Sequence, residues 1–281
     1  MKNSALIFHN RSMAEVLDPR SIELRKKIIT ALEHGRRGHI GASFSLVEIL
    51  RVLYDKILKF DAVAPSWPGR DRCILSKGHG CLALYVLLAE KGFFPEEALY
   101  HFCQDGALLG GHPDATKIPG VEASTGSLGH GLSIGVGMAV NAGYEKSGAR
   151  VFVIAGDGEC NEGSLWEAAM GAGKYGLDNL TVLVDYNKYQ SYDTTSYVQE
   201  LEPFADKWRS FGFGVIEING HDVTELTDVL KHLPLKKGKP SAIICHTIKG
   251  KGVGFAENNL AWHHKSKIDS EMITQLMDAL G

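Results

Sequence analysis

Apolar residues recur along the 281-residue chain in two alternating patterns, one with helical spacing and one in short continuous runs. The first helix is predicted to begin after Asp18-Pro19, a capping residue followed by a proline, and to end at Gly35. Ser45 is predicted to open a second helix, whose apolar residues lie three and four positions apart as far as Ile57. The same pattern predicts helices over residues 82–91, 95–102, 132–146, 165–174 and 223–233.

Five short apolar runs lie between these helices and are typical of strands buried on both faces. They are Arg72–Leu75, Val151–Ala155, Leu180–Asp185, Gly214–Ile218 and Ala242–Cys245. Strands that alternate with helices predict an α/β fold with a doubly wound, mainly parallel sheet and helices on both of its faces. No repeat or long linker interrupts the chain. Residues 1–281 are therefore predicted to form a single domain with an N-terminal helical extension over about residues 1–35.

Composition and charge narrow the class of protein. The 30 Lys and Arg against 33 Asp and Glu give a formal charge of −3, with no basic stripe to attract nucleic acid or an anionic membrane. No apolar run approaches the ~20 residues that span a bilayer, and the N-terminus lacks a signal-peptide pattern. The five cysteines form no C-x-x-C pair and favour free thiols in a reducing compartment. We expect a cytoplasmic protein that binds neither nucleic acid nor membranes.

Histidine follows glycine directly at five places in the chain. Glycine permits close approach of the backbone, and histidine both donates and accepts hydrogen bonds and titrates near neutral pH. Five such pairs together predict a polar pocket that receives a ligand. The pairs are Gly38-His39, Gly78-His79, Gly111-His112, Gly129-His130 and Gly220-His221.

The strongest functional motif follows the strand predicted at Val151. This strand runs into Asp157-Gly158, and the next predicted strand is followed by Asn187. The carboxyl ends of parallel strands can be neighbours, and carboxylate and amide oxygens suit Mg²⁺ or Ca²⁺. An Asp-Gly hairpin would require an alternating strand after Gly158, but the chain continues with a helical composition, whose start favours an anion. The sequence therefore predicts a site for a metal and a phosphate.

The Gly-Asp-Gly motif, with Asn187 about thirty residues later, resembles the thiamine-diphosphate fingerprint. Four further motifs, in order ahead of it, resemble the N-terminal segment of transketolases. They are Gly38-His39-Ile40-Gly41, Leu75-Ser76-Lys77-Gly78-His79-Gly80, Gly111-His112-Pro113 and Thr125-Gly126-Ser127-Leu128-Gly129-His130-Gly131. The resemblance extends from about Asp18 to Ser266 and implies the thiamine-diphosphate-binding fold.

This resemblance implies a set of cofactor contacts. It implies that the metal, Mg²⁺ or Ca²⁺, is bound by Asp157, Asn187 and the backbone carbonyl of Tyr189. Contacts to thiamine diphosphate are implied for His79, for the backbone of Gly158 and for His263. Glu162 matches a family glutamate in a carboxylate network across the subunit interface and is expected on the cofactor side of the site. The aminopyrimidine ring is expected against the backbone of Gly126, Ser127 and Leu128.

Three histidines are implied in catalysis. By resemblance His39 and His112 line the substrate channel, and His263 lies near both cofactor and substrate. Thiamine diphosphate would supply the carbanion for ketol transfer, and these histidines would move protons to and from sugar hydroxyls. His130, which replaces a family glutamine, is expected at most to line the site. Lys249 and Lys251 are expected on a solvated loop, and His221 is expected outside the site beside the helix cap Asp222.

Full-length transketolases continue with a pyrimidine-binding domain and a C-terminal domain, whereas this chain stops at Gly281. No residue matches the family glutamate that protonates the aminopyrimidine. We therefore expect the N-terminal subunit of a split transketolase that acts with a C-terminal subunit, as a heterotetramer of two chains of each kind. Its sugar phosphates would belong to the pentose phosphate pathway or be unusual branched or sulfonated sugars.

Two alternatives remain open from the sequence. The α subunit of a 2-oxoacid dehydrogenase, or another thiamine-dependent decarboxylase, shares the element from Gly-Asp-Gly to Asn187 but not the motifs ahead of it. A non-catalytic binding protein descended from such a subunit is the other alternative, and the intact set of motif residues argues against it.

Overall fold

The computed structural model describes residues 17–281, so the predicted extension over about residues 1–35 lies partly outside it. Helix α1 (Pro19–Gly35) begins as predicted, because the Asp18 carboxylate accepts hydrogen bonds from the amides of Arg20 and Ser21 at 3.0 and 3.2 Å. Its predicted apolar face, which includes Leu24 and Ile28, is buried. This face packs into the larger of two apolar cores.

The helix predicted from Ser45 has a different start. Helix α2 (Ile40–Phe44) and helix α3 (Val47–Val52) precede a π-helical turn, η1 (Leu53–Ile57). The prediction that Ser45 opens this helix is wrong, because the Ser45 hydroxyl is buried and donates to the Asp185 carboxylate at 2.6 Å. That contact is long-range, so local spacing does not reveal it.

All five predicted strands are present, each within one residue of its predicted bounds, and all pair in parallel in the order β1-β2-β3-β5-β4. They are β1 (Arg72–Leu75), β2 (Val151–Gly156), β3 (Leu180–Tyr186), β4 (Gly214–Asn219) and β5 (Ser241–His246). Both β2 and β3 are buried along their whole length, as expected of central parallel strands. The predicted α/β fold with a parallel sheet is confirmed.

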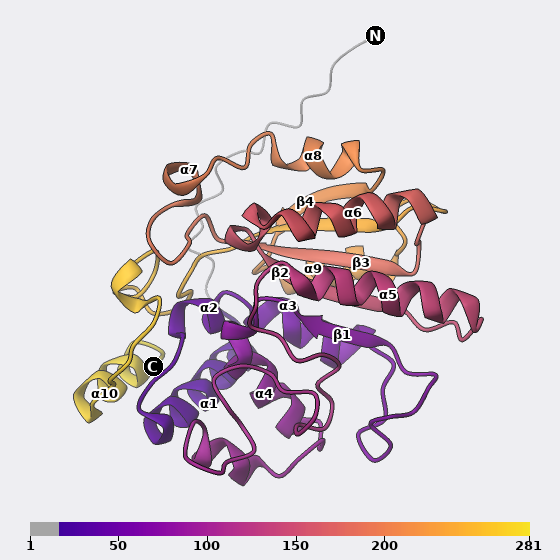
Figure 1. The fold of residues 1–281 in the computed structure, drawn as a ribbon. Coiled ribbons are helices and arrows are strands. Elements are labelled where there is room, and N and C mark those ends of the chain that lie inside the picture. The colour runs from indigo at the N-terminus through magenta and orange to yellow at the C-terminus, as the bar shows by residue number, and fades with distance from the viewer. Residues whose placement is uncertain (1–16) are drawn as a thin grey trace.

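Helices cover both faces of this sheet (Figure 1). Val153 of β2 points into the core shared with α5 (His130–Tyr144), α6 (Gly163–Tyr175) and α8 (Phe204–Ser210). Its neighbours Phe152 and Ile154 point into the core shared with α1, α3, α4 (Cys81–Glu90) and α9 (Val223–Lys231). The alternation along one strand therefore supports two apolar cores.

Several short elements were not predicted or differ in type. The segment predicted as a helix over 95–102 is a 3-10 helix, η3 (Glu96–His101). Three further 3-10 turns and two helices have no counterpart in the predictions: η2 (Gly78–Gly80), η4 (Gly158–Asn161), η5 (Leu260–Trp262), α7 (Thr195–Val198) and α10 (Ser270–Asp278). Helix α8 was likewise not predicted.

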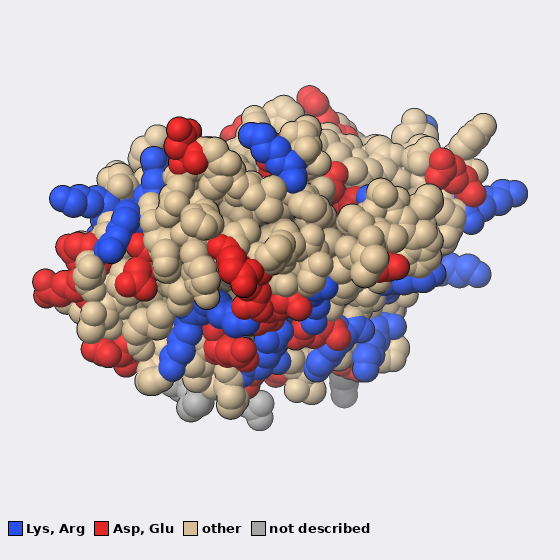
Figure 2. Space-filling view, turned by 90° about the horizontal axis from the view of Figure 1, so that it is seen from below, with Lys and Arg blue, Asp and Glu red and all other residues tan. Residues whose placement is uncertain are grey.

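The thiols match the expectation from composition, and one face of the surface is mixed in charge. In Figure 2 acidic and basic side chains are interspersed on the face that is shown. All five cysteines are free thiols, and four of them are buried. Within residues 17–281, no helix combines the length and the apolar character needed to cross a bilayer.

Candidate active site

The candidate site lies at the carboxyl edge of the sheet. Because all five strands run in the same direction, the segments that follow them converge at this edge. The segment after β1 carries His79, the one after β2 carries Asp157, and the one after β3 carries Asn187. The segment after β5 carries Lys249. Four connections that lie far apart in the sequence therefore contribute to one region.

Asp157 and Asn187 end two neighbouring strands, as predicted. Asp157 is buried, and its two carboxylate oxygens accept hydrogen bonds from the amides of Gly158 at 2.7 Å and Lys188 at 2.6 Å. The Asn187 side-chain oxygen accepts from the amide of Tyr189 at 3.1 Å. Burial, together with the charge of Asp185, raises the pKa of Asp157 to about 7. Because its surroundings disfavour the charged form, a cation bound beside the Asp157 carboxylate would stabilise that charged form.

Asp185, at the end of β3, connects these strand ends to the motif after β1. Its buried carboxylate forms an ion pair with the buried ammonium of Lys77 and accepts a 3.3 Å hydrogen bond from the Asn187 amide nitrogen. Burial alone would raise the pKa of Asp185, but the charge and hydrogen bond of Lys77 hold it below its usual value. Asp185 therefore orients Asn187 and was not identified from the sequence.

Lys249 belongs to the site, contrary to the sequence-based expectation. Its ammonium is buried and donates to the backbone carbonyls of Tyr189 at 3.2 Å and Gln190 at 3.0 Å. Burial and the charge of Lys77 lower the pKa of Lys249 to about 8. Lys251 is also buried, so the expectation of a solvated loop is wrong for both lysines. The segment after β5 is a loop of turns, as expected, but residues 247–251 are buried rather than solvated.

Four histidine rings surround that of His39. The ring centroid of His39 lies 5.3 Å from that of His79, 5.6 Å from His263, 6.2 Å from His112 and 4.5 Å from His264. The structure therefore brings the three predicted catalytic histidines together with the predicted cofactor ligand His79. His264 is the additional member of this group, which we call the histidine cluster.

Backbone hydrogen bonds join the segment that carries His39 to the segment that carries His263 and His264. Gly38 and Lys265 exchange two hydrogen bonds, from amide to carbonyl, at 2.9 and 3.0 Å. This bridge places His39 beside His263 and His264, although the segments come from opposite ends of the chain.

Burial keeps His39, His79, His112 and His263 of the histidine cluster uncharged at neutral pH. Burial and the neighbouring cations lower the pKa of His39 to about 4 and that of His263 to about 3. Burial also lowers the pKa of His79 well below its usual value and that of His112 to a smaller extent. Neutral imidazoles each offer one donor and one acceptor, so the cluster can exchange protons and hydrogen-bond hydroxyl groups.

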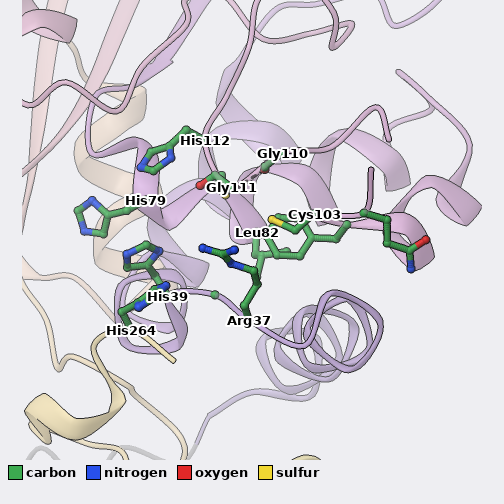
Figure 3. A pocket seen from close by; sticks show the side chains of 13 residues that line it. Arg37, His39, His79, Leu82, Cys103, Gly110, Gly111, His112 and His264 are labelled. Atoms are coloured by element: carbon green, nitrogen blue, oxygen red, sulfur yellow. Dashed lines mark hydrogen bonds between the residues drawn. The ribbon is translucent and has the colours of Figure 1, made fainter. Parts of the chain in front are cut away.

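The histidines line one side of a cavity of about 420 Å³ (Figure 3). His39, His79, His112 and His264 face this cavity, and its opposite wall includes Cys103. We call it the histidine cavity. Its size and its polar lining are those of a site for a small polar ligand.

The remaining predicted residues lie around this region. A Cβ atom on Gly126 would lie 2.7 Å from the His112 ring, so only glycine lets the backbone approach that histidine. Ser127 is exposed, and the carbonyl of half-buried Leu128 accepts from the exposed His130 at 3.2 Å. Glu162 is exposed at the start of α6. Within the described chain, none of Ser127, Leu128, His130 and Glu162 lines the histidine cavity.

Glu159 and His221 are buried polar residues near these elements. The Glu159 carboxylate accepts hydrogen bonds from the Ser76 hydroxyl, from the amide of Gly129 at 2.8 Å and from the amide of Gly156 at 3.1 Å. It joins the ends of β1 and β2 to the start of α5, and no sequence signal identified it. His221 lies outside the cavity, and Asp222 caps α9 as expected.

The residues at the carboxyl edge fit a diphosphate with a divalent metal. The side-chain oxygens of Asp157 and Asn187 are hard donors, and the Tyr189 carbonyl keeps a lone pair beside its bond to Lys249. Two buried nitrogens in this region, Gln190 Nε2 and His263 Nδ1, have no hydrogen-bond partner among the described residues. Unpartnered buried polar atoms cost free energy, so a polar ligand that reached them would be favoured.

Comparison with known proteins gives a consistent picture. Residues 21–281 match the family model described as the thiamine diphosphate binding domain of transketolase. The chain is 45% identical to the 6-deoxy-6-sulfo-D-fructose transketolase subunit of Clostridium sp. (strain MSTE9), over 84% of this chain and 85% of that protein. It is 40% identical to an apulose-4-phosphate transketolase subunit of Phocaeicola vulgatus, over 89% of each.

A solved structure shares the same fold. The transketolase of Pichia stipitis, in complex with sedoheptulose 7-phosphate, superposes with a TM-score of 0.87 at 28% identity. The alignment covers 93% of this chain but 40% of that one, so the chain spans less than half of this larger protein.

Proposed function

Because this chain belongs to the transketolase family, we propose that it is the N-terminal subunit of a two-chain transketolase. The enzyme would transfer a two-carbon ketol unit from a ketose to an aldose. The observation that carries this proposal is the histidine cluster, because its member His79 follows β1 at the same edge of the sheet where Asp157 follows β2 and Asn187 follows β3.

The metal and diphosphate would bind at the carboxyl edge. Asp157, Asn187 and the Tyr189 carbonyl would hold the metal, Mg²⁺ or Ca²⁺, and Gly158 and His79 would contact the diphosphate of thiamine diphosphate. A Cβ atom on Gly158 would lie 2.8 Å from the Gln190 side chain, so glycine keeps this approach open. When bound, the cofactor supplies a stabilised carbanion.

The histidine cluster would handle the protons of ketol transfer. His39, His112 and His263 would donate to and accept from hydroxyl and carbonyl oxygens of the sugar. Their lowered pKa values keep the imidazoles neutral at pH 7, so each can act as a general base through its free nitrogen. Neutral rings also avoid repulsion from the nearby ammonium of Lys249.

The two-chain arrangement is supported by the relatives of similar length. The two relatives described above, which are 45% and 40% identical to this chain, are both named as subunits. The alignment with this chain covers at least 85% of the length of each. We propose a cytoplasmic heterotetramer of two copies of each chain, with Ser127, Leu128 and Glu162 accessible here and covered in the assembly. Its sugars would be pentose phosphates or unusual sugars, such as the 6-deoxy-6-sulfo-D-fructose and apulose 4-phosphate that those relatives' names specify.

A tagged copy of the chain, isolated from its own host, tests this proposal. Native mass spectrometry would measure its partners, and ketol transfer would be assayed with Mg²⁺, thiamine diphosphate, xylulose 5-phosphate and ribose 5-phosphate. A second donor, 6-deoxy-6-sulfo-D-fructose, and a 2-oxoacid would be tested in parallel.

We expect a partner in equal amount and transfer activity that requires both chains. Turnover of the 2-oxoacid without ketol transfer would favour the decarboxylase alternative. Ketol transfer by the chain alone would refute the two-chain arrangement but not the transketolase activity. A complex that binds no thiamine diphosphate would refute both.

A further inference from the structure

The charge of the histidine cavity is uneven. Among the described residues that line it, Arg37 is the one lysine or arginine, and there is no aspartate or glutamate. Burial keeps His39, His79 and His112 beside it neutral at pH 7. The cavity therefore has a single permanent charge, and that charge is positive.

Arg37 extends into the cavity from the connection between α1 and α2. Figure 3 shows its guanidinium directed toward the middle of the cavity, near His39 and Leu82. The next residue, Gly38, is held in place by its backbone bridge to Lys265. Within residues 17–281 the Arg37 side chain has no ion pair or hydrogen bond, so its donors are available to a ligand.

The preceding residue shows that this placement is specific. Arg36 caps the end of α1 in a left-handed conformation, and its guanidinium donates to the hydroxyl of Ser270, the first residue of α10, at 3.3 Å. Arg36 does not line the histidine cavity. The two adjacent arginines are both exposed and carry the same charge but have different surroundings, which makes Arg36 a matched control.

A guanidinium binds tetrahedral anions through two parallel hydrogen bonds, and no carboxylate in this cavity competes for it. We propose that Arg37 binds the anionic end of the sugar substrate, a phosphate or a sulfonate, and thereby sets the preference for charged sugars. This inference rests on the proposed transketolase function. It adds a specificity residue to the wall of the histidine cavity.

The experiment uses the two-chain enzyme loaded with Mg²⁺ and thiamine diphosphate. The variants are Arg37→Gln, Arg37→Lys and the control Arg36→Gln. Each is assayed with an uncharged pair, L-erythrulose and D-glyceraldehyde, and with charged sugars that carry either a phosphate or a sulfonate. We expect Arg37→Gln to lower kcat/KM for charged sugars roughly 10- to 100-fold, mainly through KM.

For the uncharged pair, kcat/KM of Arg37→Gln should change by less than about twofold. Arg37→Lys should recover part of the loss in kcat/KM for charged sugars, and Arg36→Gln should have the kcat/KM values of the wild type. A loss confined to phosphates or to sulfonates would identify the anion. Equal losses on charged and uncharged sugars, or no loss at all, would overturn the proposal.

A binding measurement separates this inference from the proposed function. Inorganic phosphate and sulfate would be titrated into the cofactor-loaded complex and followed by thermal unfolding. Stabilisation of the wild type that Arg37→Gln abolishes would support the anion site even if no sugar pair were turned over. Equal stabilisation of both proteins would overturn it.

Discussion

At the scale of the residue, His39 is the centre of the histidine cluster, and its charge state has a measurable consequence. Burial lowers its pKa from 6.5 to about 4, so the unfolded chain takes up this proton first as the pH falls. The contribution of His39 to stability is therefore present above pH 6.5 and is lost as the pH falls toward 4. Its ring should titrate by NMR with a midpoint near 4.

The variant His39→Gln should lose less stability than wild type between pH 7 and pH 5, by roughly 1–2 kcal/mol, since one pKa unit corresponds to about 1.4 kcal/mol. Urea unfolding at both pH values measures this difference. His101→Gln, at an exposed histidine of η3, is the control and should follow the wild type. A His39 ring that titrates at 6.5 or above would contradict the prediction.

Glu159 and Glu162 give a second contrast between residues, because they lie three positions apart and differ in burial. The Glu159 carboxylate accepts from three donors, and a glutamine there would turn an NH₂ group toward at least one of them. We expect Glu159→Gln to lower the free energy of unfolding by about 1–3 kcal/mol. Glu162→Gln, at an exposed side chain, should change it by less than about 0.5 kcal/mol. Equal effects in chemical denaturation would show that the Glu159 network contributes little.

At the scale of the element, a buried charge network joins α1 and α3 to the segment that carries Lys249. The Arg25 guanidinium donates to Glu48 at 2.6 Å and to the carbonyl of Lys251 at 2.8 Å. Glu48 also pairs with His221 at 2.8 Å, and the other nitrogen of His221 accepts from the Ile248 amide at 2.9 Å. The segment is therefore held on both sides of Lys249.

Burial alone would raise the pKa of Glu48, but Arg25 and His221 hold it well below its usual value. Glu48→Ala would leave the guanidinium of Arg25 buried without its partner. We expect a loss of about 3–5 kcal/mol in unfolding free energy. Glu23→Ala, which removes exposed ion pairs from α1, should cost less than about 1 kcal/mol. A small effect of Glu48→Ala in urea unfolding would mean that water replaces the network.

The elements also differ in how well the sequence alone predicts them. The five strands were predicted closely because buried parallel strands are continuous apolar runs that a local window detects. Histidines of the cluster followed from short motifs and a family resemblance. The start of α3, the burial of Lys249 and the role of Glu159 depend on partners far away in the sequence, such as Asp185 for Ser45. No local pattern encodes such partners, and short elements such as α7 have too few residues for periodicity.

At the scale of the whole molecule, ligand binding at the carboxyl edge should stabilise all elements together, because the edge collects segments from the length of the chain. Mg²⁺ with thiamine diphosphate should raise the melting temperature of the complex by roughly 5 °C at saturation, and a chelator should reverse the rise. Asp157→Asn should abolish this shift, because it replaces a charged metal ligand with a neutral one.

Asp206→Asn, at an exposed aspartate of α8, is the control for that measurement and should keep the full shift. An equal rise in melting temperature for Asp157→Asn would show that Asp157 does not bind the metal. Differential scanning calorimetry with and without each ligand distinguishes the two results.

The backbone bridge between Gly38 and Lys265 has a consequence for synthesis on the ribosome. A nascent chain can form α1 and the first strands early, but His39 gains its neighbours His263 and His264 only after the last segment has emerged. Until then the carboxyl edge lacks these two histidines, and a product truncated before Lys265 is expected to bind no cofactor. Cofactor binding should therefore follow the completion of translation, and chains that end prematurely should not remove cofactor from solution.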